Sequence, residues 1–235
     1  MSSFKNKTIL ITGAGKRLGK ELALFCHAQG ANLRLHANTS KREVELLADE
    51  VNGSFVISDF RKLADEGADA ITDGVDYIIH NASTYSSNTF DTIAPQTYVE
   101  DQNINALAPL TLTSALYRKK LCSNTFGGVI FFLDARERGI RNRISYFLSK
   151  SVLKSAMPML AREFAPVLRV NAIMLGSVLP EDTADSDSVN LRDAATLFGK
   201  CPNVSDLCNA VHYLLTTPNL TNQTLYVDSG RHLRD

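Results

Sequence analysis

The fold of this chain is decided by the stretch Lys7-Thr8-Ile9-Leu10-Ile11-Thr12-Gly13-Ala14-Gly15-Lys16-Arg17-Leu18-Gly19. Its first half is apolar and β-branched without polar alternation, which is typical of a parallel strand buried on both faces. A glycine-rich turn follows, and then a helical pattern that turns Leu22, Phe25 and Cys26 to one side. Glycines let the main chain approach a phosphate, and a helix N-terminus offers free N–H groups. A plain strand-to-helix turn is the alternative, but the position directly after a strand favours a nucleotide pyrophosphate site.

Strand patterns and helix patterns alternate through the rest of the chain. Further strands are expected at 32–36, 54–57, 76–80, 128–133, 169–173 and 224–228, and helices at 61–72, 97–122, 146–163 and 204–216. The helix at 97–122 should bend near Asn105, because Pro109 cannot donate to the residue four before it. This alternation predicts one α/β domain over 1–235, a Rossmann-type, doubly wound parallel sheet of seven strands. Residues 176–203 lack periodicity and are expected to form a mobile segment over the substrate.

Ligands of such sheets bind beyond the carboxyl ends of the strands. The residues expected to share that crevice are those that directly follow strands: Gly13, Asp59, Asn81, Asp134 and Gly176.

The composition excludes several classes of protein. Lys+Arg and Asp+Glu are both 25, so the net charge is zero and neither a nucleic acid nor an anionic membrane is an expected partner. No apolar run reaches the length of a membrane span, and the first residues lack the apolar core of a signal peptide. Four scattered cysteines without a CxxC pair predict a reduced, cytoplasmic protein without a metal.

The second expected strand ends in a segment that bears on cofactor choice. Residues 37–42 read Ala-Asn-Thr-Ser-Lys-Arg, and no acid appears before Glu43. A carboxylate here would bind a ribose 2′-hydroxyl, whereas cations and hydroxyls suit a 2′-phosphate. With Arg17 nearby, the pattern favours NADP(H) over NAD(H). The alternative is that Lys41 and Arg42 merely open a solvated helix.

Asp59 follows the third expected strand and has two equally supported interpretations. Its carboxylate could accept from the amino group of an adenine, or it could cap the next helix.

Tyr146 and Lys150 stand four residues apart in Ser145–Lys150, on one face of a helix. An ammonium one turn away favours the phenolate, so the two could form a general acid and its tuning charge. The alternative is an exposed helix surface. Asp134 ends the fifth expected strand, where it could transfer protons, cap a helix or pair with an arginine of the loop that follows.

These motifs, in this order, resemble those of the short-chain dehydrogenase/reductases over nearly the whole chain. The matching stretches are Thr12–Gly19, Asn81-Ala82, the trio Asn105, Tyr146 and Lys150, then Arg169–Ala172 and Asp228–Gly230.

The departures from that family's usual pattern are also informative. Arg17 replaces a glycine, Asp134 replaces a serine, and Leu175-Gly176 replaces Pro-Gly. Together with Asn81-Ala82-Ser83 before an aromatic Tyr85, they resemble the pteridine reductases. The segments Glu137–Gly139 and Gly230–Arg234 resemble the bacterial dihydromonapterin reductases in particular, which also have weak dihydrofolate reductase activity.

The resemblance implies NADPH-dependent reduction of a dihydropterin or folate in a homotetramer built through the helices around Asn105 and Tyr146. It implies proton delivery by Asp134 and Tyr146, with Lys150 orienting the nicotinamide ribose and Asn105 holding the bent helix and a water of the relay. Cofactor contacts are implied for Gly13, Lys16, Arg17, Leu18, Gly19, His36, Asn38, Thr39, Ser40, Asp59, Asn81, Ala82, Ser83, Tyr146, Lys150, Gly176 and Ser177. Substrate contacts are implied for Arg17, Ser83, Tyr85, Asp134 and Tyr146, with Tyr85 stacking on the pterin unless it simply covers the core.

Two rival functions remain on the same fold. The first is a reductase of ketones or 3-oxoacyl thioesters, against which Asp134 argues because a carboxylate repels a developing alkoxide. The second is a non-catalytic NADP(H)-binding sensor, against which the intact pair of Tyr146 and Lys150 argues.

Overall fold

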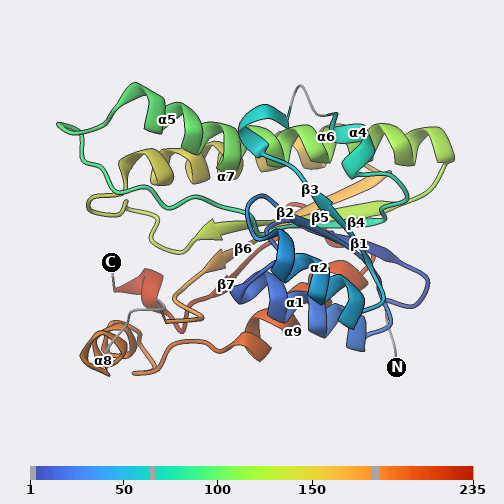
Figure 1. The fold of residues 1–235 in the computed structure, drawn as a ribbon. Helices are drawn as coiled ribbons and strands as arrows, with labels where there is room; N and C mark the ends of the chain where they lie inside the picture. Colours follow the sequence, from blue (N-terminus) through green and yellow to red (C-terminus); the bar gives the residue numbers. More distant parts are fainter. Residues whose placement is uncertain (1–3, 64–66, 181–185, 235) are drawn as a thin grey trace.

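Seven parallel strands form one sheet in the computed structural model, which describes residues 4–63, 67–180 and 186–234 (Figure 1). Their order is β3-β2-β1-β4-β5-β6-β7, so the direction of winding reverses between β1 and β4. The strands are β1 (Thr8–Ile11), β2 (Asn32–Ala37), β3 (Ser54–Ile57), β4 (Tyr77–His80), β5 (Gly127–Asp134), β6 (Leu168–Leu175) and β7 (Thr224–Val227). The predicted doubly wound, seven-stranded sheet is confirmed. Its reversal point is where such sheets bind ligands.

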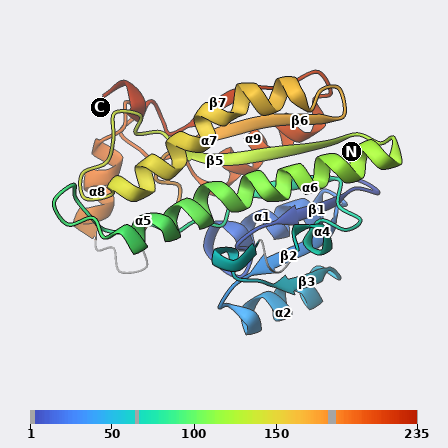
Figure 2. The ribbon, with the colours of Figure 1, turned by 90° about the horizontal axis from the view of Figure 1, so that it is seen from above.

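Helices cover both faces of the sheet (Figures 1 and 2). One face carries α1 (Arg17–Ala28), α2 (Lys41–Glu50) and α9 (Val204–Thr216), and the other carries α4 (Ala68–Ile71), α6 (Ala108–Ser123) and α7 (Ile144–Glu163). Along β1, Ile9 and Ile11 pack into the first layer and Leu10 into the second, and all three are fully buried. Both faces of β1 are therefore apolar, which explains its unbroken apolar sequence.

The helix predicted at 97–122 consists of three consecutive parts. They are α5 (Pro95–Gln102), a π-helical turn η2 (Asn103–Leu107) and α6, whose first turn contains Pro109. The bend predicted near Asn105 is present as this π-helical turn, a form that accommodates a missing donor within a helix.

Two predicted segments differ from the structure. The helix predicted at 61–72 is replaced by a short 3-10 turn, η1 (Phe60–Lys62), and the single turn α4, and residues 64–66 lie outside the described residues. The segment 176–203 contains a helix, α8 (Ser186–Ala194), although residues 181–185 lie outside the described residues. The side chains described on α8 are exposed or only partly buried. A helix that does not pack against the core needs no apolar stripe, which explains why the sequence shows no helical period here.

Helix α8 and the C-terminal 3-10 turn η3 (Arg231–Leu233) lie together beyond the ends of β5 and β6 (Figure 1). The main-chain N–H of Leu197 donates to the carbonyl of Ser229 at 3.0 Å, which ties the two segments together. Within the described part of the chain, every helix is too short or too polar to cross a membrane.

Candidate active site

The glycine turn after β1 requires its glycines because main-chain atoms approach one another closely. A Cβ at Gly19 would lie 2.2 Å from the carbonyl oxygen of Gly13, and one at Gly15 would lie 2.8 Å from the Cβ of Ser40. Arg17, which replaces a family glycine, has a φ of 53° in the left-handed region. An arginine tolerates that conformation at a cost of about 1–3 kcal/mol. Its guanidinium donates to the carbonyl of Pro180 at 2.8 Å, so it links the turn to the segment after β6.

Side chains from neighbouring strands hold the turn in place. The amide of Asn81 donates to the carbonyls of Thr12 and Gly13 at 2.9 and 3.0 Å. The hydroxyl of Thr12 in turn accepts from the main-chain N–H groups of Asn81 and Ala82. Nδ1 of His36 accepts from the N–H of Gly13 at 3.3 Å while Nε2 faces the carbonyl of Ser58 at 3.0 Å. Asn81 and His36 are therefore built into the frame of the turn.

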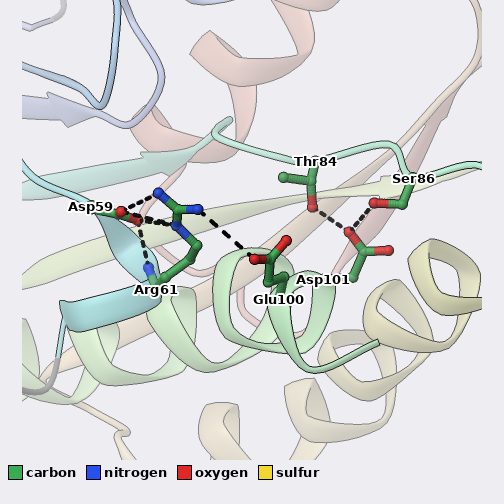
Figure 3. A network of polar contacts seen from close by, with 6 residues as sticks. All are labelled: Asp59, Arg61, Thr84, Ser86, Glu100 and Asp101. Carbon is green, nitrogen blue, oxygen red and sulfur yellow. Dashed lines mark hydrogen bonds and ion pairs between the residues drawn. The ribbon is translucent and has the colours of Figure 1, made fainter. Parts of the chain in front are cut away.

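Asp59 caps the turn that follows β3. Its carboxylate accepts from the main-chain N–H of Arg61 at 3.0 Å and from the guanidinium of Arg61 (Figure 3). These hydrogen bonds, and more weakly the charge of Arg61, lower the pKa of Asp59. The structure thus contains the cap, while the contact of Asp59 with an adenine stays a prediction; Asp59 is absent from the described lining of the cavity.

One cavity of about 950 Å³ follows the carboxyl ends of the strands. Nearly all the residues predicted to bind cofactor or substrate line it: Gly13, Lys16, Arg17, Leu18, Gly19, His36, Asn38, Thr39, Ser40, Asn81, Ala82, Ser83, Tyr85, Asp134, Tyr146, Lys150, Gly176 and Ser177. We call residues 13–19 and 36–40 the glycine end, and Tyr85, Asp134, Arg136 and Tyr146 the aspartate end. Asp59 and Asn105 are the two predicted residues that the structure does not bring to the lining.

The glycine end carries cations and hydroxyls without a carboxylate among its described lining residues. Lys16 and Arg17 line it beside Ser40, whereas Lys41 and Arg42 are exposed on α2 and lie outside the lining. The cations that face a nucleotide there are thus those of the turn itself.

At the aspartate end, Asp134 sits between a phenol and a guanidinium. The hydroxyl of Tyr146 donates to Oδ2 of Asp134 at 3.2 Å, and Arg136 donates to both carboxylate oxygens at 2.9 and 2.7 Å. Arg136 also donates to the hydroxyl of Tyr85 at 3.1 Å. The ring of Tyr85 meets that of Tyr146 edge-on at 4.7 Å and is 43% exposed, so it borders the cavity and does not cover the core. The guanidinium of Arg143 lies 4.3 Å from the Tyr85 ring centre.

These contacts set the charge of the two acids. Burial alone would raise the pKa of Asp134, but the hydrogen bonds and charge of Arg136 outweigh it and lower that pKa. Burial and then the Asp134 carboxylate raise the pKa of Tyr146 well above its usual value. The net shift is thus opposite to the one that Lys150 alone would cause, and the tuning of Tyr146 by Lys150 stays a prediction. At neutral pH the pair consists of a carboxylate and a phenol that keeps its proton.

Lys150 is buried behind Tyr146. Its ammonium donates to the carbonyl of Phe132 at 2.9 Å and lies 5.7 Å from the ring centre of Tyr146. Burial lowers the pKa of Lys150 to about 8, although the Asp134 carboxylate opposes the shift. Burial and the charge of Lys150 also lower the pKa of His80 to about 3, so that imidazole is neutral and Lys150 is the nearby cation.

Comparison with known proteins places this geometry in a family. Residues 13–232 match the family model described as enoyl-(acyl carrier protein) reductase. The chain belongs to the short-chain dehydrogenase/reductase family. Tyr146 and Lys150, which carry part of the resemblance to this family in the sequence, both line the cavity.

Individual relatives of this short-chain dehydrogenase/reductase extend the comparison. Dihydromonapterin reductase of Citrobacter koseri is 29% identical over 240 residues, which span 96% of this chain and 97% of the relative. The protein of the same name from Escherichia coli O6:H1 is 28% identical over the full length of both chains. Among solved structures, the FolM alternative dihydrofolate reductase 1 of Brucella canis, complexed with NADP, has a TM-score of 0.91 at 23% identity and covers 99% of this chain and 96% of its own. The Brucella suis protein in complex with NADP has a TM-score of 0.88 at 26% identity, covering 99% and 97%.

Asn105, which belongs to the same resemblance as Tyr146 and Lys150, lies outside the cavity lining. Its Oδ1 accepts from the hydroxyl of Ser83 and the N–H of Thr84, while Nδ2 donates to the carbonyl of Thr84 and the hydroxyl of Ser149. Asn105 is fully buried, and both donors and the acceptor are engaged with protein groups. These contacts fit the expectation that Asn105 holds the bent helix, and its hold on a water of the relay stays a prediction.

Asp101 is a site residue that the sequence did not single out. This fully buried carboxylate accepts from the hydroxyls of Thr84 at 2.5 Å and Ser86 at 2.8 Å (Figure 3), and from the hydroxyl of Ser145 on α7. Tyr85 lies between the first two of these, so the carboxylate fixes the segment that presents its ring. Asn88 adds a second tie, because its Oδ1 accepts from the N–H of Ser145 at 3.0 Å. In the sequence, Asp101 appears as an ordinary polar residue of a helix.

Arg136 was expected only as one of several loop arginines. Its position two residues after Asp134 allows its main-chain N–H and its side chain to donate to the same carboxylate. That spacing is the signal that would have identified it.

Proposed function

We propose that this protein uses NADPH to reduce a dihydropterin, such as dihydromonapterin or dihydrofolate, to its tetrahydro form. The names of its full-length relatives and of its structural neighbours support this proposal. The observation that carries it is the hydrogen bond between Tyr146 and Asp134 beside the cavity. A serine is the usual neutral donor to a ketone, whereas an Asp–Tyr pair suits a C=N bond whose nitrogen must gain a proton.

The glycine end fits the pyrophosphate and the adenosine part of the cofactor. The close approaches of Gly13, Gly15 and Gly19 leave main-chain atoms, in place of side chains, to face the phosphates. Lys16, Arg17 and Ser40 supply the charges and donors that a 2′-phosphate needs. When bound, NADPH supplies the hydride.

The aspartate end handles the proton. The proton shared by Tyr146 and Asp134 passes to the ring nitrogen of the substrate and is replaced from water. Lys150 holds its position through Phe132 and offers a positive charge behind the phenol. Tyr85 provides an aromatic surface on which a pterin can stack, and Ser83 and Arg17 border the same space.

The segment 176–203 is proposed to cover the bound substrate. Gly176, Ser177, Ser188 and Arg192 of this segment line the cavity, and Arg17 links to it through Pro180.

A side-by-side assay of NADPH oxidation with dihydromonapterin, dihydrobiopterin and dihydrofolate tests the proposal directly. The Asp134→Ser protein should lose reduction of the preferred dihydropterin by roughly 10²–10⁴, as expected for a residue of proton transfer. An acetoacetyl thioester serves as the comparison substrate. Full pterin activity in the variant, or efficient reduction of the thioester by the unaltered protein, would contradict the proposal. Tight NADPH binding without turnover of any substrate would indicate a sensor.

We also propose a homotetramer in the cytoplasm. Exposed apolar side chains on α5, η2, α6 and α7 support association through these helices: Val99, Leu107, Leu121, Val152 and Met159. Light scattering should give the mass of a tetramer, and Met159→Glu should reduce it. The four cysteines are unpaired in the structure, which agrees with a reducing compartment.

A further inference from the structure

Two arginines approach the cavity from adjoining elements that the proposed chemistry does not use. Arg192 lies on α8 and Arg231 opens η3, and both side chains line the cavity. The guanidinium of Arg234 donates to the carbonyl of Ala194 at 2.5 Å, and Leu197 is bonded to Ser229 as described above. The two arginines are thus held on neighbouring supports although 39 positions separate them in the sequence (231 − 192).

Their nitrogen atoms lack acceptors. Nε and Nη1 of Arg192 and Nε of Arg231 are buried and have no hydrogen-bond partner among the residues that the structure describes. Among the same residues no ion pair joins either guanidinium to a carboxylate, although the charge of Arg192 acts on Asp193 beside it and on the thiol of Cys201. Buried donors without acceptors are costly, and like charges on adjoining elements add repulsion. An anion placed between them would remove both costs.

The other cations of the cavity have partners or positions that explain them. Lys16 and Arg17 belong to the glycine end, Arg136 is paired with Asp134, and Lys150 is bonded to Phe132. Arg192 and Arg231 lie apart from the glycine end in the sequence and on different elements. Ser188, one helical turn before Arg192, lines the cavity beside them.

We propose that Arg192 and Arg231 form a subsite for an anionic tail on the substrate, a phosphate or a carboxylate. Guanidinium groups bind both through paired N–H donors. The inference rests on the proposed function and narrows it, because the preferred dihydropterin then carries a charged side chain instead of a neutral polyol. Ser188 adds a hydroxyl to the same subsite.

The test compares three substrates that differ in the tail: dihydromonapterin, the phosphate ester of a dihydropterin, and dihydrofolate with its carboxylates. The unaltered protein should favour at least one charged tail in kcat/KM, and the double variant Arg192→Gln/Arg231→Gln should lose that preference by roughly 10- to 100-fold, the effect of charge-assisted hydrogen bonds. A preference for the phosphate ester alone, or for dihydrofolate alone, identifies which anionic group the subsite binds. Arg162→Gln, an exposed arginine on α7 away from the cavity, is the matched control and should leave the ratio unchanged.

The remaining outcomes separate this inference from the proposed function. If the neutral and charged substrates are reduced equally, and the double variant does not change their ratio, the subsite is wrong while the function stands. If NADPH affinity falls by the same factor as kcat/KM, the arginines serve the cofactor and the subsite is again wrong.

If no dihydropterin is reduced at all, the proposed function fails and calorimetry decides the subsite. Inorganic phosphate and folic acid should then bind the NADP⁺-loaded protein and bind the double variant at least tenfold more weakly, and equal binding overturns the subsite. The single variants Arg192→Gln and Arg231→Gln, each expected to lose part of that binding, replace the double variant if it does not fold.

Discussion

The two ends of the cavity are built differently. At the glycine end, main-chain atoms approach one another closely. At the aspartate end, charged and hydroxyl side chains from distant parts of the sequence hydrogen-bond to one another. Gly13, Gly15 and Gly19 leave no space for a Cβ within one turn. Asp134, by contrast, depends on Tyr146 twelve residues later, and Tyr85 depends on an arginine 51 residues later. The first end is thus a binding surface fixed by local geometry, and the second is a chemical group tuned by tertiary contacts.

The largest effect should come from removing the phenol. Tyr146→Phe deletes the proton that the phenol donates to Asp134 and should lower kcat by roughly 10²–10⁴. Steady-state kinetics of dihydropterin reduction measure it, and NADPH binding followed by fluorescence should change far less. Tyr213→Phe, half-exposed on α9, is the control. A variant that loses cofactor affinity and keeps kcat would show that the two ends are not separable in this way.

Gly19→Ala should act on the glycine end of the cavity, and it should change NADPH affinity more than kcat. The new Cβ would lie 2.2 Å from the carbonyl of Gly13 and 2.8 Å from the amide of Asn81, so the turn must shift. An overpacking cost of about 1–3 kcal/mol corresponds to a loss of NADPH affinity of roughly 5- to 150-fold. Titration with NADPH measures the loss. Gly74→Ala, whose Cβ would meet nothing within 4 Å, is the control: its positive φ makes an alanine cost stability, and it should leave NADPH affinity unchanged.

The difference between local geometry and tertiary contacts also explains what could be predicted from the sequence. The strand, turn and helix at 7–19 are local patterns, and they predicted the parallel sheet and the glycine end. The bend near Asn105 also follows from one nearby proline. The segment 186–194 was missed because its helix has no apolar period, and the helix at 61–72 was predicted from a polar pattern that packing does not support.

Contacts across long sequence separations were out of reach. Nothing local marks Asp101 as the acceptor for Thr84, Ser86 and Ser145, or Arg231 as a neighbour of α8. The net upward shift of the Tyr146 pKa also depends on such contacts, because burial and the Asp134 carboxylate raise it.

Arg136→Met should change the pH dependence of the aspartate end. Burial raises the pKa of Asp134 and Arg136 lowers it, so removing Arg136 leaves burial to act and the pKa rises. More Asp134 is then protonated at a given pH, and the step of the kcat profile that follows the titration of Asp134, which lies in the acid range in the unaltered protein, should move to higher pH by about one unit or more. Profiles of kcat taken below pH 8, the approximate pKa of Lys150, keep that lysine charged.

Arg138→Met is the matched control for this prediction, because Arg138 is exposed and lies outside the cavity lining. A profile that stays in place when Arg136 is removed would mean that the protonation of Asp134 does not limit the reaction.

The smallest effect should come from Asp101, which acts on the aspartate end through Tyr85. Asp101→Asn keeps the shape of the side chain but offers an N–H to one of three hydroxyls that now donate to a carboxylate. A lost hydrogen bond to a charged group costs about 1.5–3 kcal/mol, part of which the segment 84–86 recovers by moving. Since that movement displaces the ring of Tyr85, KM for the dihydropterin should rise roughly three- to thirtyfold, within that cost, while kcat changes less.

Glu100→Gln is the control that makes the Asp101 prediction specific. Glu100 adjoins Asp101 on α5, but its carboxylate turns the other way and faces Arg61 at 3.8 Å (Figure 3). Glu100 is half-exposed, so its ion pair contributes little. If loss of charge on α5 were enough to disturb the site, both variants would raise KM equally. A rise in KM confined to Asp101→Asn, with NADPH affinity unchanged in both, would show that a buried carboxylate outside the cavity positions the substrate surface and leaves the glycine end untouched.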